Sequence, residues 1–355
     1  MKIAMLLPSL SNTGPGIVVR ELCTEFISKG HECKVFYFDD IIQLQMPCPV
    51  ERINFREAID FAHWDIVHSN MLRPDGYVWY HASRNHIPHA TKLVTTLHQP
   101  ISFKALHTNY GMLQSLIGSC LWGKFISTFM RIVVLNSDTA TELSGKIDTS
   151  KVEVIHNGRN IPIKREVANK KDKELLLRLK NKYKIIGTVS SITKRKGLYQ
   201  MIEALPYLPD FAFVAVGAGD QLDGLKQRSI ELGCSERCLW VGYRDDATEY
   251  LSMFDMFVMC TYSEGFPLAL IEAAAYGLPT VLSDIPILKS IMSDEQVAFY
   301  QLENIKDLAS KIQQAYRERE KYSRNIRSHY EQHLTATAMA DNYLKLYSDI
   351  NFKSY

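Results

Sequence analysis

The chain has 355 residues, of which 46% are hydrophobic and 23% are charged, and its formal net charge is +2. This length predicts two domains, each large enough to bury its own core. The small net charge and the mixing of both signs give no reason to expect a nucleic-acid partner. Seven cysteines without a C-x-x-C pair favour free thiols in a reducing cytoplasm over a disulfide framework or a zinc site.

Short apolar runs alternate with helical segments through the first half of the chain. The opening residues, MKIAMLLPSL, have an apolar run too short for a signal peptide and are expected to form a buried strand. Such alternation predicts a parallel sheet covered by helices on both faces. The expected strands are residues 2–7, 33–38, 65–70, 92–97, 131–135 and 152–155, and the expected first helix is 16–29, ended by Gly30.

Residues 164–184 are rich in Lys, and we interpret them as a linker that leads into a solvated helix. A second alternating series follows, and the chain is mostly helical from about residue 304. The sequence therefore predicts an α/β protein with two doubly wound domains, 1–163 and 185–330, which bind ligands at the carboxyl ends of their strands. The expected strands of the second series are 185–190, 211–217, 238–242, 255–260, 280–284 and 297–302, and the helices are near 197–205, 221–232, 246–253, 267–276 and 336–349.

The strongest site signal is EGFPLALIEAAAYGLPTVLSD, residues 264–284, where a strand-to-helix turn carries one carboxylate and the helix a second. Gly265 lets the backbone approach a ligand, and Pro267 has the φ angle of a first helical turn. Glu272 lies about one turn below the free amides at the helix start. An anion-binding helix N-terminus between two carboxylates that suit sugar hydroxyls indicates a nucleotide-sugar site.

The spacing of Glu264 and Glu272, with the Gly-Phe-Pro turn and the Gly-Leu-Pro helix end, resembles the E-x7-E motif of the retaining GT-B glycosyltransferases of family four, the group 1 glycosyltransferases. The resemblance covers nearly the whole chain. It implies a GT-B fold, in which two Rossmann-like domains face a cleft, the first binds the acceptor, and residues 331–355 pack back on that domain. It also implies a hexosyl- or N-acetylhexosaminyl-type transferase without a cofactor.

The implied substrates are a nucleotide diphosphate sugar, with a UDP-sugar favoured, and a hydroxyl of a glycan or lipid-linked acceptor in cell-surface polysaccharide synthesis. Glu264 is expected to contact the donor sugar, Glu272 the ribose and Lys196 the diphosphate. Family members usually have an Arg where this chain has Ser191, and we expect Arg195 to have taken over that role. The other expected donor-binding residues are Gly14, Gly16, Gly217, Gly242, Tyr243, Gly265, Phe266, Pro267 and Leu268.

His98 ends a predicted strand in the sequence TLHQP and resembles the strand-end His of the family. It is expected to face the cleft, to bind a hydroxyl as part of the catalytic site, and to be oriented by Thr95 or Thr96. His68, in DIVHSN, is a weaker example of the same arrangement. The chain contains no D-x-D and no H-E-x-x-H sequence, so neither a metal site nor metal-dependent transfer is expected.

Three alternatives remain open at this point. A Rossmann oxidoreductase would use the GPGIVV turn together with Asp39 or Asp40, although two of the three fingerprint glycines are weak support. A nucleotide-sugar 2-epimerase of GT-B fold would bind the same donor without an acceptor. A catalytically inactive subunit would bind the nucleotide and never turn over, and the Ser191 departure keeps that interpretation open.

Residues 112–130, MLQSLIGSCLWGKFISTFM, have apolar side chains at helical spacing. One interpretation is packing into the core. The other is an acceptor surface at the inner face of the cytoplasmic membrane, with Trp122 and neighbouring cations such as Lys124 at headgroup level. No run of 18 or more apolar residues is present that would span a bilayer.

Overall fold

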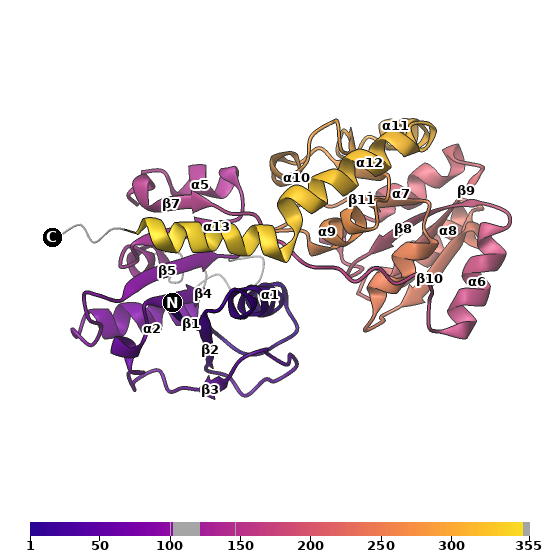
Figure 1. Ribbon diagram of the computed structural model, residues 1–355. Coiled ribbons are helices and arrows are strands. Elements are labelled where there is room, and N and C mark those ends of the chain that lie inside the picture. Colours follow the sequence, from indigo (N-terminus) through magenta and orange to yellow (C-terminus); the bar gives the residue numbers. More distant parts are fainter. Residues whose placement is uncertain (100, 102–120, 146, 351–355) are drawn as a thin grey trace. The chain divides into compact units, whose positions relative to one another are not determined.

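The computed structural model describes residues 1–355 except for 100, 102–120, 146 and 351–355. The chain divides into two compact units, which we describe separately (Figure 1). Unit 1 comprises Met1–Asn160 and Leu334–Tyr355, and unit 2 comprises Ile161–His333. Residues 164–184, expected as a linker, belong to unit 2, where they contain the helix α6 (Lys170–Lys180).

Unit 1 is built on a seven-stranded sheet with the order β3-β2-β1-β4-β5-β6-β7, in which all neighbouring strands are parallel. The sheet confirms the parallel α/β arrangement expected from the buried apolar runs. Its strands are β1 (Lys2–Leu7), β2 (Glu32–Tyr37), β3 (Val50–Arg52), β4 (Ile66–Asn70), β5 (Lys92–Leu97), β6 (Arg131–Val134) and β7 (Val152–Val154), and its helices include α1 (Gly14–Ser28), α2 (Leu72–Ala82), α5 (Ser137–Leu143) and α13 (Ala336–Asp349).

The last helix of the chain, α13, packs beside α1 in unit 1 (Figure 1). Thr335 caps it by accepting a hydrogen bond from the amide of Ala338 at 3.1 Å. The inward face of α13 brings two tyrosines to the sheet. The Tyr347 hydroxyl lies 2.6 Å from His68 Nδ1, and the Tyr343 hydroxyl lies 2.9 Å from Thr96 Oγ1.

A second polar network lies on the opposite face of the same strands, since successive side chains of a strand alternate between faces. Asp75 of α2 accepts hydrogen bonds from Ser69 at 2.5 Å, from Thr95 at 2.7 Å and from the Trp122 indole at 2.6 Å. Burial raises the pKa of Asp75 to about 6, although the three hydrogen bonds favour its charged form.

The position of Trp122 corrects one of the two interpretations of residues 112–130. Trp122 is fully buried, and so are Ile126 and Phe129, whereas a membrane interface would require an exposed indole. Core packing is confirmed for these three residues, whereas Leu121 is exposed and residues 112–120 lie outside the described residues. In the parts of the chain that the structure describes, no helix is long and apolar enough to cross a membrane.

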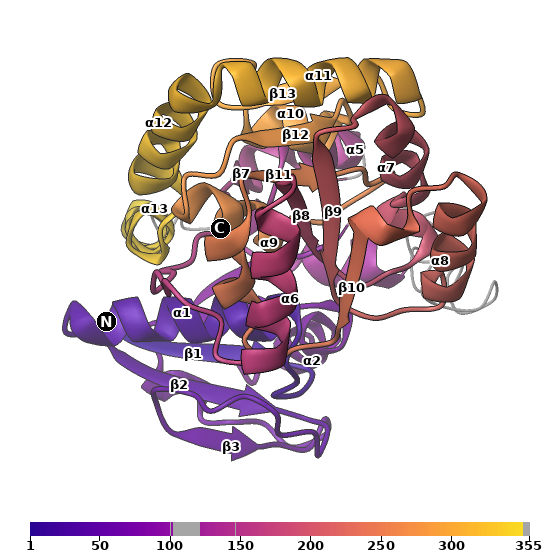
Figure 2. The same cartoon turned by 90° about the vertical axis from the view of Figure 1, so that its right-hand side faces the viewer.

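Unit 2 contains a six-stranded parallel sheet with the order β10-β9-β8-β11-β12-β13 (Figure 2). Its strands are β8 (Lys184–Val189), β9 (Phe211–Val216), β10 (Cys238–Gly242), β11 (Met256–Met259), β12 (Thr280–Ser283) and β13 (Ala298–Tyr300). Its helices, besides α6, are α7 (Tyr199–Ala204), α8 (Leu222–Glu231), α9 (Leu268–Ala275), α10 (Pro286–Ile291), α11 (Ile305–Arg317) and α12 (Arg319–His329).

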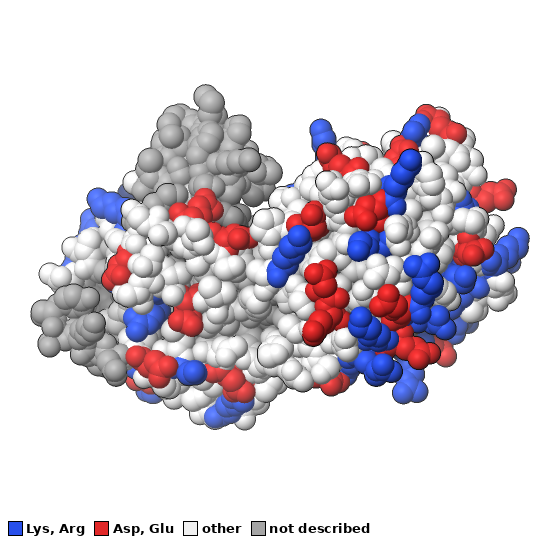
Figure 3. All heavy atoms as spheres, turned by 90° about the horizontal axis from the view of Figure 1, so that it is seen from above, with Lys and Arg blue, Asp and Glu red and all other residues white. Residues whose placement is uncertain are grey.

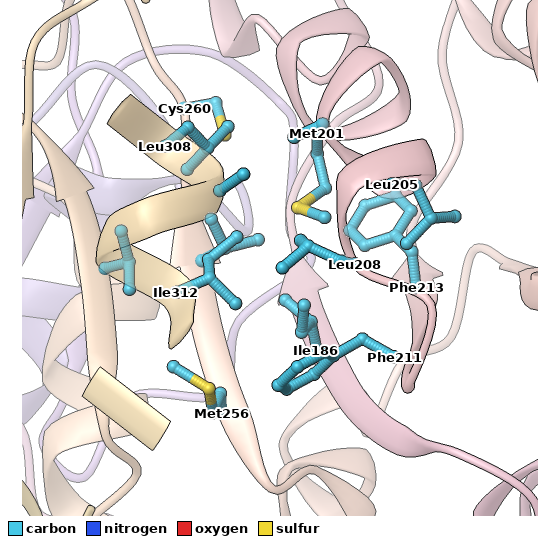
Figure 4. Close-up of a cluster of buried hydrophobic side chains, with 14 of the residues drawn as sticks. Ile186, Met201, Leu205, Leu208, Phe211, Phe213, Met256, Cys260, Leu308 and Ile312 are labelled. Atoms are coloured by element: carbon cyan, nitrogen blue, oxygen red, sulfur yellow. The ribbon is translucent and has the colours of Figure 1, made fainter. Parts of the chain in front are cut away.

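The core of unit 2 forms where α7 and α11 pack together over the sheet (Figure 4). Met201 of α7 faces Leu308 and Ile312 of α11 close to Ile186 of β8, and all four are fully buried. By contrast, charged side chains of both signs are interspersed over the face of the molecule seen in Figure 3. The apolar core keeps the strand ends of unit 2 in a fixed arrangement.

We expect the stability of unit 1 to fall in mild acid because of His68, whose pKa burial lowers to about 3. An unfolded His gains a proton below about pH 6.5, whereas folded His68 does not, so His68 destabilises the fold progressively from pH 6.5 downward, by up to about 2 kcal/mol at pH 5. Asp75 opposes this trend, because its folded state already binds a proton near pH 6.

His68→Gln should therefore reduce the drop in thermal midpoint between pH 7 and pH 5, measured by calorimetry. The exposed His89→Gln serves as the matched control and should leave that drop unchanged. An equal drop in all three proteins would contradict the role given to His68.

Candidate functional site

The strands of unit 2 all run in one direction, so their carboxyl ends lie along one edge of the sheet. The expected donor-binding residues of this unit follow the ends of four neighbouring strands. Lys196 and Arg195 follow β8, Gly217 follows β9, Gly242 and Tyr243 end and follow β10, and Glu264, Gly265, Phe266, Pro267, Leu268 and Glu272 follow β11.

Glu264 is held between two cations from the turn after β8. Lys196 Nζ lies 2.6 Å from Glu264 Oε1, and Arg195 NH1 lies 3.1 Å from Glu264 Oε2. The Glu264 side chain is only 6% exposed, so its charge requires this compensation. The sequence assigned these residues to one site, and the structure brings all three into direct contact.

Backbone and side-chain hydrogen bonds join the turn after β8 to the loop after β11. The Arg195 carbonyl accepts from the Tyr262 amide at 2.9 Å and from Thr261 Oγ1 at 3.1 Å. Arg195 in turn donates from NH1 to the Ser263 carbonyl at 2.6 Å, and Gln200 Nε2 donates to the Cys260 carbonyl at 2.9 Å. The sequence did not single out Thr261 or Gln200, although Thr261 lies only three residues before Glu264.

Two glycines permit close approach of backbone at these strand ends. Gly197 has φ +59°, and a Cβ there would lie 2.2 Å from the Cys260 carbonyl oxygen. Gly217 has φ +146°, and a Cβ there would lie 1.8 Å from the Ser190 carbonyl oxygen. The Gly217 amide donates to the Gly242 carbonyl at 2.9 Å, which links the ends of β9 and β10. These contacts leave no room for a side chain at either position.

Tyr243 follows Gly242, and its side chain is 64% exposed. A hydrogen bond to Asp245 raises the pKa of Tyr243 above its ordinary value, so the ring is neutral at physiological pH. A neutral, exposed aromatic ring at a strand end offers a surface for stacking.

The helix α9 begins at Leu268, and Pro267 occupies its N-cap rather than its first turn. No side chain caps this end, and the Leu270 amide donates to the Pro267 carbonyl at 3.0 Å, so the amides of Leu268 and Ala269 are the ones that an anion could bind. Glu272 lies one turn into the helix and is buried, with 9% of its surface exposed. Gly265 and Phe266 form the loop that leads into this helix.

Three candidate residues lie in unit 1. Gly14 begins α1, and Gly16 lies so close to the Ser11 carbonyl oxygen that a Cβ would be 2.5 Å from it. His98 follows β5 and is half-buried, with Nε2 2.9 Å from Asn70 Oδ1. Burial lowers the pKa of His98 to about 4, so this ring is neutral at pH 7.

The expectation that Thr95 or Thr96 orients His98 is wrong. Thr95 donates to Asp75 on one face of the sheet, and Thr96 bonds to His68 at 2.8 Å on the other. The residue that contacts His98 is Asn70, at the end of the neighbouring strand β4.

The other candidates of unit 1 have structural partners. His68 is fully buried between Thr96 and Tyr347, which fits a structural role. Asp39 is paired with Arg73, and Asp40 lies 3.3 Å from Arg52. Within the described ranges, no group of three or more His, Cys, Asp or Glu side chains is arranged to hold a metal ion.

Comparison with known families identifies the two halves of the chain. Residues 169–332 match the family described as glycosyl transferases group 1, and residues 49–161 match glycosyltransferase family 4. The second match lies in unit 1 except for its last residue, and the first lies in unit 2 and includes Lys196, Glu264 and Glu272.

Relatives and solved structures agree with these matches. The chain is 26% identical to the O-antigen biosynthesis glycosyltransferase WclY of Escherichia coli, over 99% of both chains. It is 33% identical to a UDP-Gal:alpha-D-GlcNAc-diphosphoundecaprenol alpha-1,3-galactosyltransferase of Escherichia coli, over 39% of this chain and 38% of that one. The structure of Anabaena Alr3699/HepE in complex with UDP is similar in fold, with a TM-score of 0.80 and 17% identity over 99% of this chain and 100% of that one. The chain thus belongs to the GT-B glycosyltransferases of the group 1 and family 4 type.

Proposed function

We propose that this glycosyltransferase moves a hexosyl or N-acetylhexosaminyl group from a UDP-sugar to a hydroxyl of a lipid-linked glycan, with retention of configuration and without a metal ion. The observation that carries the proposal is the cluster of Lys196, Arg195 and Glu264 directly before the uncapped start of α9. It places two cations, a carboxylate and free amides at one edge of a sheet, which suits a sugar diphosphate.

Each group at this edge has a chemical task toward the donor. Lys196, Arg195 and the first amides of α9 stabilise the diphosphate, whose charge increases as it leaves. Glu264 accepts hydrogen bonds from hydroxyls of the sugar, and Glu272 accepts them from the ribose. Gly217, Gly242 and Tyr243 border the base, and His98 of unit 1 accepts a hydrogen bond from a substrate hydroxyl. The acceptor docks on unit 1.

The cations must exchange partners when the donor binds, because both Glu264 oxygens are already bound to them. The diphosphate attracts Lys196 and Arg195 more strongly than one carboxylate does, since it carries about two negative charges. Glu264 is then released from part of its ion pairing and becomes an acceptor for sugar hydroxyls. Binding of the donor diphosphate is thereby linked to the ability of Glu264 to accept hydrogen bonds from the sugar.

The transfer breaks the bond between the sugar C1 and the phosphate oxygen and forms a bond from C1 to the acceptor oxygen on the same face. The departing phosphate oxygen takes the acceptor proton, so the reaction needs no protein base. The charge that develops on the diphosphate is met by Lys196 and Arg195 rather than by a metal, which is why we propose metal independence. The lack of a D-x-D sequence supports this mechanism.

The proposed acceptor and location rest on the named relatives. One is an O-antigen biosynthesis enzyme, and another acts on a diphosphoundecaprenol-linked sugar. By analogy, we place the enzyme in cell-surface polysaccharide synthesis, at the cytoplasmic face of the membrane that holds such lipids. The buried Trp122 offers no support for the membrane contact, which instead follows from the proposed lipid-linked substrate.

Two alternative functions use the same donor site. A nucleotide-sugar 2-epimerase would change the donor without an acceptor, and an inactive subunit would bind UDP without turnover. Incubation of the full chain with UDP- and GDP-sugars, with and without a polyprenyl-diphosphate saccharide and EDTA, separates them. We expect acceptor-dependent release of UDP that survives EDTA and an α-linked product from an α-linked donor. Epimerised donor, or binding without turnover across the acceptors tested, would overturn the proposal.

Glu272 and Glu264 should differ in their effect on nucleotide binding. Glu272→Ala removes an acceptor for the ribose and should weaken UDP binding by roughly 1.5–3 kcal/mol. Glu264→Gln should leave the affinity for UDP intact or tighter, because it frees two cations, and should lower turnover. Calorimetry of both folded variants with UDP, and rates at saturating donor, check these outcomes. The reverse pattern would remove the roles assigned to the two residues.

If Arg195 replaces the Arg that family members usually have at the position of Ser191, it should contribute to turnover about as much as Lys196 does. Arg195→Ala and Lys196→Ala should each lower turnover at saturating donor by about tenfold or more, since each removes charge stabilisation of the diphosphate. The matched control is Lys194→Ala, because Lys194 is exposed and has no ion pair among the described residues. Wild-type turnover in Arg195→Ala, with increased turnover in Ser191→Arg, would refute the replacement.

Gly197→Ala should abolish most UDP binding, because the new Cβ would lie 2.2 Å from the Cys260 carbonyl oxygen. This clash would push the turn after β8 away from the loop after β11. Gly233→Ala is the control, since Gly233 has φ +65° but no other atom within 4 Å of the position that its Cβ would take. Both variants carry a backbone strain of about 1 kcal/mol. We expect the control to lose that much stability and to keep its UDP affinity, measured by denaturation and calorimetry. Equal UDP affinity in both variants would contradict the contact.

A further inference from the structure

The ends of β4 and β5 place Asn70 beside His98. Asn70 pairs in register with Thr96, and His98 lies two residues farther along the chain, so both side chains project from the same face of the sheet. The contact between them joins Asn70 Oδ1 and His98 Nε2 at 2.9 Å. Which of the two ring nitrogens carries the proton therefore depends on the orientation of the Asn70 amide.

Two backbone carbonyls determine that orientation. Asn70 is 1% exposed, and its Nδ2 lies 3.3 Å from the Leu6 carbonyl oxygen and 3.5 Å from the His68 carbonyl oxygen. A carbonyl oxygen only accepts hydrogen bonds, so the amide NH2 must face these two atoms. A flipped amide would set its own oxygen against them, and burial makes such repulsion costly. Asn70 Oδ1 consequently faces His98.

An oxygen acceptor at this place requires a proton on His98 Nε2. On this face of the sheet, the described neighbours His68, Tyr343 and Tyr347 form hydrogen bonds with Tyr347, Thr96 and His68, respectively, and none of them carries a negative charge that would favour an imidazolium. With its pKa lowered to about 4 by burial, His98 is neutral at pH 7, and its Nδ1 then has a lone pair and no proton. In the part of the chain that the structure describes, Nδ1 has no hydrogen-bond partner.

We propose that Asn70 is a positioning residue that holds His98 as the neutral Nε2–H tautomer, so that Nδ1 accepts a hydrogen bond from a hydroxyl of the substrate. A bare ring nitrogen repels phosphate and carboxylate oxygens, which carry no proton to donate. The partner of His98 is therefore a sugar or acceptor hydroxyl and not the diphosphate. The hydroxyl assignment rests on the proposed glycosyl transfer, whereas the tautomer is independent of it.

The tautomer is measured directly by long-range proton–nitrogen NMR of the full chain with 15N-labelled histidine at pH 7.5. We expect His98 to show a protonated Nε2 and a bare Nδ1, with the exposed His89 as the internal reference. Asn70→Ala should release this constraint and shift His98 toward the mixture of tautomers that the exposed His89 shows. A protonated Nδ1 in the wild type, or an unchanged tautomer in Asn70→Ala, would overturn the proposal whether or not the enzyme's substrate is known.

A pair of substitutions tests the hydroxyl contact. His98→Asn places an amide near the former Nδ1 and preserves an acceptor there, whereas His98→Gln places its amide near the former Nε2 and preserves only the contact to Asn70. We expect His98→Gln to lower kcat/KM about tenfold and His98→Asn to lower it about threefold or less, since a hydrogen bond contributes about 0.5–1.5 kcal/mol. A structural role predicts the opposite order.

The two tests separate failure of the inference from failure of the proposed function. Retention of activity in His98→Gln, together with its loss in His98→Asn, would refute the hydroxyl contact in an active transferase. Absence of transfer by the wild type would refute the proposed function and would leave the NMR result to decide the role of Asn70.

Discussion

The arrangement of unit 2 depends on one partly enclosed carboxylate, Glu264, whose charge is compensated by Lys196 and Arg195. A carboxylate with 6% exposure is costly unless both oxygens have partners. Because the partners come from the turn after β8, that turn and the loop after β11 cannot move independently. The hydrogen bonds from Thr261 and Tyr262 to the Arg195 carbonyl also connect this turn to this loop. One ion-pair cluster thus sets the geometry of two strand ends.

The sheets were predictable because every central strand is a short, β-branched or apolar run buried on both faces. The elements that escaped prediction lack this signal. The edge strand β3, Val50–Arg52, is exposed throughout, and α2 carries Pro74 and Gly76 near its start, which obscure a helical pattern. The short α10 begins with Pro286 and follows β12 closely, so its apolar residues merge with those of the strand. Local sequence cannot show how such segments pack.

The candidate site likewise has residues whose position the sequence predicted and contacts that it did not. The location of Glu264, Lys196 and the glycines at strand ends was predictable because their residue types and positions carry a local signal. The partner of His98 was misassigned to Thr95 or Thr96, since cross-strand neighbours depend on a register that one strand does not encode. Trp122 shows a related limit: helical spacing of apolar residues fits both a core and a membrane surface. The acceptor for its indole, Asp75, lies 47 residues away in the chain.

The chemistry of the candidate residues differs between the two units. Unit 2 has formal charges, with Lys196, Arg195 and Glu264 at one edge of its sheet, which suits the dianionic leaving group of the proposed transfer. The candidate residues of unit 1 are neutral and polar. Burial lowers the pKa of His98, so its ring is uncharged at pH 7, and the Asn70 amide has no charge. In the proposed transfer, the acceptor hydroxyl keeps its proton until the leaving phosphate takes it. A neutral hydrogen-bond acceptor suits this hydroxyl better than a strong base, which would remove the proton early. The tautomer of His98 therefore matters more to the proposed reaction than its basicity.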